Sequence, residues 1–165
     1  MKKIFLLATI LIFLPSVAFA GIMPQSEMKV GGIGYGSELS YVKKIFGEPT
    51  ERKSFSGDGV RTVTWIYSEK FSVTARTDID DDRPEEDLPV VAFSLKDDSL
   101  ATPGGITVGM IYNAVVRQWG MGEFLTDYDG RRAYFYTPND SQVPMTLTFY
   151  VEDGRITEIA LGTDF

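Results

Sequence analysis

Two copies of one short pattern lie in the chain, and this repeat constrains the fold more than any other feature. Gly32-Ile33-Gly34-Tyr35-Gly36 is matched 73 positions later by Gly105-Ile106-Thr107-Val108-Gly109. At the same offset three apolar residues and a closing glycine recur: Leu39, Val42, Phe46 and Gly47 meet Tyr112, Val115, Trp119 and Gly120. Apolar residues at relative positions 0, 3 and 7 before a glycine predict a short amphipathic helix that stops there.

A hairpin follows the predicted helix in each copy. With the offset reduced to 71, Asp58-Gly59 meets Asp129-Gly130, and Trp65 meets Tyr136. Asp-Gly ahead of alternating β-branched and aromatic residues is typical of a hairpin turn. Two further strands are predicted in each half, at 71–75, 90–95, 145–151 and 156–161. The chain is thus predicted to hold two helix-plus-four-strand units, residues 21–98 and 99–165, in one compact domain.

These elements predict the layout of the sheet. Antiparallel strands with helices gathered at one end of each unit are typical of an α+β fold. We expect one antiparallel sheet shared by both repeats, with the helices on one face. The other face is then free, because an antiparallel sheet tolerates water on one side. A broad uncovered face is a natural docking surface for another molecule.

The first 20 residues have the three parts of a secretory signal. Lys2 and Lys3 give a positive start, residues 4–14 are an uncharged apolar run, and Ala18 and Ala20 suit a cleavage site. The run is too short for a membrane-spanning helix, which needs roughly 20 apolar residues. A lipid anchor is not expected either, because the chain has no cysteine. These features predict a periplasmic or secreted protein without a stable membrane anchor.

The charge and the missing residue types exclude several functions. The chain has 16 basic and 23 acidic residues, and losing Lys2 and Lys3 with the signal leaves a net charge of −9. Such a surface repels phosphate backbones and anionic lipids, so neither nucleic acid nor membrane is an expected partner. The absence of cysteine and histidine removes disulfides, the usual general base and most zinc sites. We therefore predict no cofactor and no enzymatic activity.

The repeat resembles a known family. The run at 105–110 with Val115, Trp119 and Gly120, and the weaker copy at 32–36, are similar to the β-lactamase-inhibitor-protein-like fold. The layout also resembles small outer-membrane assembly lipoproteins, although this chain lacks their lipid-bearing cysteine.

The resemblance implies a binding role. It implies a protein that binds other proteins through an open sheet face and hairpin loops, and not an enzyme. By position, the contacts would be Asp58 in the first unit and Tyr128 with Asp129 in the second.

Aromatic residues in the strands allow two interpretations. Alternation places Tyr134 and Tyr136 on one face of the sheet and Phe135 on the other, and it gives Trp65 and Tyr67 a common face. These rings either fill the core under the helices or lie on the open face. On the open face Trp65, Tyr67, Tyr134 and Tyr136 would form a patch of the composition that protein interfaces favour.

An acidic segment, residues 78–87, joins two predicted strands of the first half, where the second half has only a turn. Asp78, Asp80 and Asp82 alternate as in the start of a calcium loop, whose oxygen ligands also alternate. However, Arg83 stands where that loop needs glycine, and Pro89 where it needs glutamate. A solvated loop, a partner-facing acidic arm and a calcium site remain the three alternatives.

The favoured hypothesis is an exported protein-binding module, with partner and oligomeric state left open by the sequence. An envelope assembly or scaffold protein is a second hypothesis. A third is a small hydrolase built on carboxylates such as Asp58, Asp129, Glu152 and Asp153, since paired acids can hydrolyse glycosides. Three of these four acids also lie in predicted turns, where aspartate is common for backbone reasons.

Overall fold

Nine strands form one continuous sheet in the computed structural model, which describes residues 21–127, 129–139 and 145–162. In the first half, helix α1 (Leu39–Phe46) precedes β4 (Glu51–Gly57), β5 (Val60–Ser68), β6 (Phe71–Asp78) and β7 (Val90–Leu95). In the second half, α2 (Asn113–Trp119) precedes β8 (Glu123–Thr126), β9 (Arg132–Pro138), β10 (Thr146–Glu152) and β11 (Arg155–Gly162). The smaller elements are β1 (Ile22–Met23), β2 (Lys29–Val30), β3 (Ile33–Gly34) and the 3₁₀ turns Gln25–Glu27 and Glu85–Asp87.

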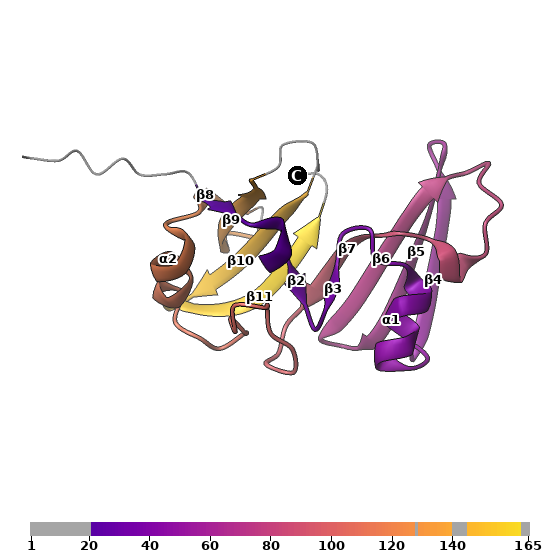
Figure 1. The fold of residues 1–165 in the computed structure, drawn as a ribbon. Coiled ribbons are helices and arrows are strands. Elements are labelled where there is room, and N and C mark those ends of the chain that lie inside the picture. The colour runs from indigo at the N-terminus through magenta and orange to yellow at the C-terminus, as the bar shows by residue number, and fades with distance from the viewer. Residues whose placement is uncertain (1–20, 128, 140–144, 163–165) are drawn as a thin grey trace, which may run out of the picture.

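The two halves meet at one strand pair. The sheet order is β4-β5-β6-β7-β11-β10-β9, with β8 and β1 both pairing with β9. β7 and β11 run antiparallel, with Leu95 opposite Ile159 and Phe93 opposite Leu161. Figure 1 shows the four strands of each half side by side, with α1 and α2 on the same side of the sheet. The prediction of an α+β fold with one shared sheet agrees with this arrangement.

The same backbone hydrogen bonds tie each helix start to the last strand of its half. All six bonds have N–O distances between 2.7 and 3.1 Å, and they join Gly36 to Val90, Val90 to Ser37, Leu39 to Leu88, Gly109 to Ile156, Ile156 to Met110 and Tyr112 to Gly154. The first three belong to the first half, and the last three follow in the same order in the second half. That the two halves arose by duplication remains a prediction.

Both helices end where the sequence predicted. Gly47 and Gly120 have positive φ angles of 80° and 77°, and each donates its N–H to the carbonyl oxygen four residues earlier. An L-residue with a side chain rarely adopts such angles, whereas glycine does so without steric cost. Each helix is therefore only about two turns long, and its burial against the sheet supplies most of its stability.

The sheet is mixed, so the prediction of a purely antiparallel sheet was wrong at one edge. β1 pairs with β9 in parallel, with Ile22 opposite Thr137. This pairing is possible because the short β8 covers only the 132–135 part of β9 and leaves its other end free. The helix side of the sheet holds the core, in which Leu39 and Val42 of α1 and Val115 of α2 are completely buried.

Candidate functional site

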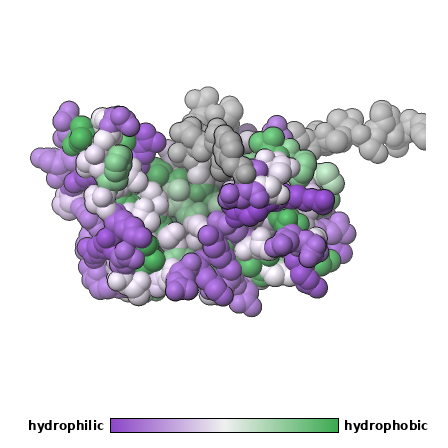
Figure 2. Space-filling view, turned by 180° about the vertical axis from the view of Figure 1, so that it is seen from behind, coloured by the Kyte–Doolittle hydropathy of each residue, from purple (hydrophilic) through white to green (hydrophobic). Residues whose placement is uncertain are grey.

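The open face is our name for the sheet surface opposite the helices. Residues that lie directly opposite one another in neighbouring strands form a row across eight strands on this face. The row consists of Glu123, Phe135, Thr148, Ala160, Ser94, Ser72, Ile66 and Glu51. Figure 2 shows the molecule from this side, with a pale to green centre between purple, hydrophilic margins. Small and hydroxyl-bearing side chains dominate the row. The surface of this face therefore has little relief, and it is mixed in polarity.

The first half contributes the more accessible part of the open face. Ser72, Thr64 and Thr74 are half-buried there, and the hydroxyl oxygens of Thr64 and Thr74 lie 3.0 Å apart across β5 and β6. In the second half, Ala133 and Thr148 are completely buried although they lie on the same side of the sheet. A partner that lands on this face therefore has most contact available over β4 to β7.

A shallow cleft of about 760 Å³ opens on this part of the face. Its floor includes Thr64, Ile66 and Ser72, and Lys53 and Lys96 stand among its lining residues. Lys53 lies 3.5 Å from Glu51, which also lines the cleft. The cleft offers hydroxyl groups and both signs of charge.

A buried carboxylate organises the centre of the open face. Glu158 on β11 accepts hydrogen bonds from Ser94 and Arg131, each at 2.8 Å. Arg131 also donates to Asp127 at 2.8 Å, and its guanidinium lies 4.1 Å from the ring centre of Tyr150. Burial works against ionisation of Asp127, but its hydrogen bonds from Arg131 prevail and lower its pKa. These contacts fix side chains from β7, β10, β11 and the loop between β8 and β9 in one network.

The first hairpin tip carries an exposed aromatic residue that the sequence did not single out. Phe55 lies on β4, two residues before the strand ends, and 63% of its surface is exposed. Asp58 is at the tip and has a φ angle of 54°, which fits the expected Asp-Gly turn. Ile79, which is 47% exposed, donates its backbone N–H to Gly59 at the same tip. The exposure of Phe55 could have been predicted from its place on an edge strand, because both sides of an edge strand can be exposed.

The predicted hairpin tip of the second half contains Tyr128 and Asp129. Tyr128 lies outside the described residues. Asp129 is exposed and lines a second cleft together with Glu152 and Asp153. Asp58 lies in the other half of the molecule, so the structure does not bring the two tip aspartates into one site.

The predicted aromatic patch on the open face is wrong for all four rings. Trp65 and Tyr136 are completely buried at opposite ends of one row on the helix side, which also contains Val73, Phe93, Leu161 and Leu147. Tyr67 packs on the rings of Phe46 and Phe71, and Tyr134 stacks on Tyr112 at 4.0 Å. Short helices leave much of the sheet to be covered, and large rings fill that space. Trp65 and Tyr136 are therefore inaccessible to a partner, whereas Tyr134 lines a cleft on the helix side.

The acidic segment packs against its own half. Lys43 of α1 lies 2.7 Å from Glu86, and the indole N–H of Trp65 donates to Glu85. Hydrogen bonds from Arg83 and Thr77 lower the pKa of Asp81. Among the residues that the structure describes, no group of three acidic side chains lies close enough to hold a metal ion. Glu85 and Glu86 thus attach the segment to the helix side of its own half, whereas Asp78, Asp80 and Asp82 are exposed to solvent, as the solvated-loop alternative expects.

Comparisons with known proteins bear on the fold only. No family model matches the chain, and no curated protein gives a significant match. A cysteine-rich secretory protein from Staphylococcus aureus has 10% identity and a TM-score of 0.52, covering 88% of this chain and 49% of that one. An extracellular protein with an SCP domain from Bacillus anthracis has 12% identity and a TM-score of 0.47, covering 99% and 50%.

A third solved structure, from Streptococcus mutans, is described as a candidate β-lactamase inhibitor protein. It has 14% identity and a TM-score of 0.32, covering 78% of this chain and 85% of that one. This chain spans about half the length of the first two neighbours. The first likeness shows a shared fold, whereas the other two TM-scores are too low to support any argument.

The predicted export signal, residues 1–20, lies outside the described residues. Within the part of the chain that the structure describes, no helix is long and apolar enough to cross a membrane.

Proposed function

We propose that the protein is an exported, non-enzymatic binding module that receives a partner protein on the open face of its first half. The observation that supports this most is the cleft of about 760 Å³ over β4 to β7, on the side of the sheet without helices. The 63% exposed ring of Phe55 lies on the same face, on β4. Aromatic anchors beside a shallow, mixed-polarity surface are typical of protein interfaces.

The composition of the face favours a protein as the partner. Lys53, Lys96 and Glu51 give both signs of charge at its margin, and threonine and serine hydroxyls form its floor. Such a surface offers many weak polar contacts and few strongly directed ones. A small ligand needs a concave, largely apolar site that buries most of its surface, whereas a protein can combine many weak contacts over a larger area.

The exposure of the carboxylates that could support a hydrolase argues against that function. Asp129, Glu152 and Asp153 line a common cleft, but all three side chains are exposed. A general acid in glycoside hydrolysis needs an apolar environment that keeps its proton near neutral pH. Exposed carboxylates lack that environment, so binding is the better-supported function.

Asp58 remains part of the proposed contact surface because it lies at the hairpin tip beyond Phe55. The predicted signal supports a binding event outside the cytoplasm, in the periplasm or beyond it. Asp129 belongs to a different surface, on the helix side.

The experiment compares two exposed rings on opposite sides of the sheet. A photo-crosslinking residue replaces Phe55 on the open face or Tyr41 on α1, which is 45% exposed. Both proteins are expressed with the natural signal, and crosslinked products are compared in the cell envelope and the medium. We expect a discrete crosslinked partner from position 55 and none from position 41. Equal products from both positions, or products from position 41 alone, would contradict the open-face assignment.

A further inference from the structure

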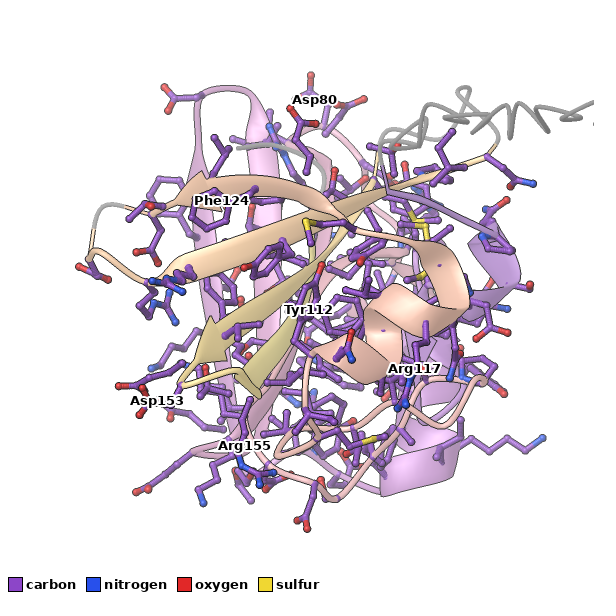
Figure 3. The ribbon with its side chains drawn as sticks, turned by 90° about the vertical axis from the view of Figure 1, so that its left-hand side faces the viewer. Asp80, Tyr112, Arg117, Phe124, Asp153 and Arg155 are labelled. Atoms are coloured by element: carbon purple, nitrogen blue, oxygen red, sulfur yellow. The ribbon has the colours of Figure 1, made fainter. Side chains whose placement is uncertain are left out.

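A second cleft lies on the helix side of the second half, and its volume is about 660 Å³. Tyr112, Val116, Tyr134 and Val151 form apolar parts of its wall. Arg132 and the acidic residues Asp129, Glu152 and Asp153 also line it. Figure 3 faces this end of the molecule and shows Tyr112 between helix α2 and the turn that carries Asp153.

The equivalent surface of the first half is covered by the chain itself. Residues 83–88 cross it on their way from β6 to β7, and Leu88 is completely buried there. Arg61 donates from its guanidinium to the carbonyl oxygen of Arg83 at 2.9 Å. Lys43 of α1 forms an ion pair with Glu86 at 2.7 Å. Glu85 accepts from the Trp65 indole and forms a second ion pair, with Arg52 at 3.7 Å. A six-residue peptide segment is therefore held on this surface by one buried leucine, polar contacts from Arg61 and Trp65, and two ion pairs.

The correspondence between the two surfaces follows from matched positions. Each helix start donates a backbone N–H to the chain just before the last strand, from Leu39 to Leu88 and from Tyr112 to Gly154. Each hairpin places an arginine at the start of its second strand: Arg61 in β5 and Arg132 in β9. Tyr112 therefore takes the place of Leu39, and Arg132 takes the place of Arg61.

The second half has no segment of its own to cover this surface. Only Asp153 and Gly154 join β10 to β11, where the first half has residues 79–89. The side chain of Arg132 has no hydrogen bond or ion pair within the described parts of the chain, unlike that of Arg61. Asp129, Glu152 and Asp153 likewise make no ion pair there. The cleft is thus the position of a covering peptide that this half does not supply.

We propose that this cleft binds a short, extended peptide segment of a partner, in which an apolar side chain is flanked by lysine or arginine. The apolar side chain lies between Val116, Val151 and the tyrosine rings, as Leu88 is buried in the first half. Arg132 donates to a peptide carbonyl, as Arg61 does. The cationic side chains of the partner peptide lie near the carboxylates of Asp129, Glu152 and Asp153. The acidic segment of the first half could not bind here, because its own carboxylates would be repelled by these three. This site is on the opposite side of the sheet from the surface proposed above, so each can fail without the other.

The probe is derived from the covering segment of the first half. A labelled peptide Arg-Pro-Lys-Lys-Lys-Leu corresponds to residues 83–88 with Glu85→Lys, Glu86→Lys and Asp87→Lys, and it keeps the leucine anchor. The unmodified acidic peptide is the matched control. We expect the basic peptide to bind the mature protein at least tenfold more tightly. Its binding should shift the backbone amide signals of residues 112–116, 130–134 and 152–157, and leave those of 50–72 unchanged.

Two charge-neutralised variants separate the cleft from general attraction to an acidic protein. The first carries Asp129→Asn, Glu152→Gln and Asp153→Asn, and asparagine tolerates the φ angle of 49° at position 153. The second carries Glu69→Gln, Asp80→Asn and Asp82→Asn, which are exposed and outside the cleft. We expect the first variant to lose at least fivefold in affinity and the second less than twofold. Equal losses, amide shifts elsewhere, or no binding of the basic peptide would overturn the proposal.

Discussion

Ser94 donates a hydrogen bond to Glu158 across the strand pair that joins the two halves, with an Oγ–Oε1 distance of 2.8 Å. Ser94 lies on β7, the last strand of the first half, and Glu158 on β11, the last strand of the second. The other carboxylate oxygen of Glu158 accepts from Arg131 at 2.8 Å. Because the Glu158 side chain is only 11% exposed, it depends on these partners for the stability of its charge.

Replacing Glu158 should therefore destabilise the whole sheet. Glu158→Ala leaves Arg131 with one fewer carboxylate and Ser94 without its acceptor, so we expect a loss of about 2–3 kcal/mol in the free energy of unfolding. Urea denaturation of the mature protein measures this. Glu123→Ala is the control, because Glu123 is exposed at the end of the same face. Similar losses of stability in the two variants would show that the hydrogen bonds of Glu158 to Ser94 and Arg131 do not stabilise the fold.

The close approach of Gly122 to Tyr136 predicts a second effect. A Cβ atom at position 122 would lie 2.7 Å from Tyr136 Cε2 and 2.9 Å from the carbonyl oxygen of Phe135. Since Tyr136 is completely buried and the second contact is backbone, neither neighbour can yield cheaply. Gly122→Ala should cost about 1–3 kcal/mol in the free energy of unfolding.

The control for this substitution is Gly57→Ala in β4. A Cβ atom at position 57 would also meet an atom at 2.7 Å, but that atom is the ring end of the exposed Phe55. The ring can rotate away, so we expect a change below about 0.5 kcal/mol. A comparable loss in thermal stability for both glycines would contradict the tight packing at Tyr136.

The buried tyrosine pair predicts a loss of stability at alkaline pH. The hydroxyl oxygens of Tyr112 and Tyr136 lie 2.8 Å apart, and Tyr136 also donates to the carbonyl oxygen of Gly120 at 2.8 Å. Burial raises the pKa of both tyrosines above the ordinary value of 10.0. Above that pH the unfolded chain releases these protons while the folded chain retains them, so unfolding becomes more favourable as pH rises.

This dependence can be measured as the free energy of unfolding between about pH 9 and pH 11.5, around the ordinary tyrosine pKa. We expect stability to decrease steadily once the pH passes the ordinary pKa. Tyr136→Phe should be less stable at neutral pH by about 1–2 kcal/mol, because it loses the bond to Gly120, and its decline with pH should be shallower. An identical decline in wild type and Tyr136→Phe would refute the assignment to this pair.

The contacts of the acidic segment predict that it stabilises the first half without calcium. Glu85 accepts a hydrogen bond from the indole of Trp65, whose ring also lies 4.7 Å from the guanidinium carbon of Arg52. Glu85→Ala leaves the indole N–H without that acceptor, so it should cost about 1–2 kcal/mol. Asp82→Ala, at an exposed position, should change stability little.

Calcium titration separates the two roles of this segment. If it only covers Trp65 and Leu88, the melting temperature of the wild type should be the same in calcium and in chelator. A calcium-dependent increase that Asp82→Ala abolishes would indicate a metal site after all.

The helix ends, the Asp-Gly turns and the four strands of each half were predictable because they depend on local chemistry. Gly47 and Gly120 stop the helices through backbone angles that other residues avoid, and Asp58-Gly59 forms its turn for the same reason. Alternation also separated Tyr134 and Tyr136 from Phe135 correctly. The sequence could not tell which of the two sets faces the helices.

Tertiary structure decided that question and the location of both clefts. Period-two alternation specifies which side chains share a face, but the choice of face depends on which one the helices cover, and that contact is long-range. For this reason Trp65 and Tyr136 are buried at the two ends of one row, while Phe55 remains exposed on an edge strand. The sequence by itself determined the order of the helix and the strands in each half, because turns and helix ends are local. Only the folded chain determined that one half covers the surface beside its helix and the other leaves it open.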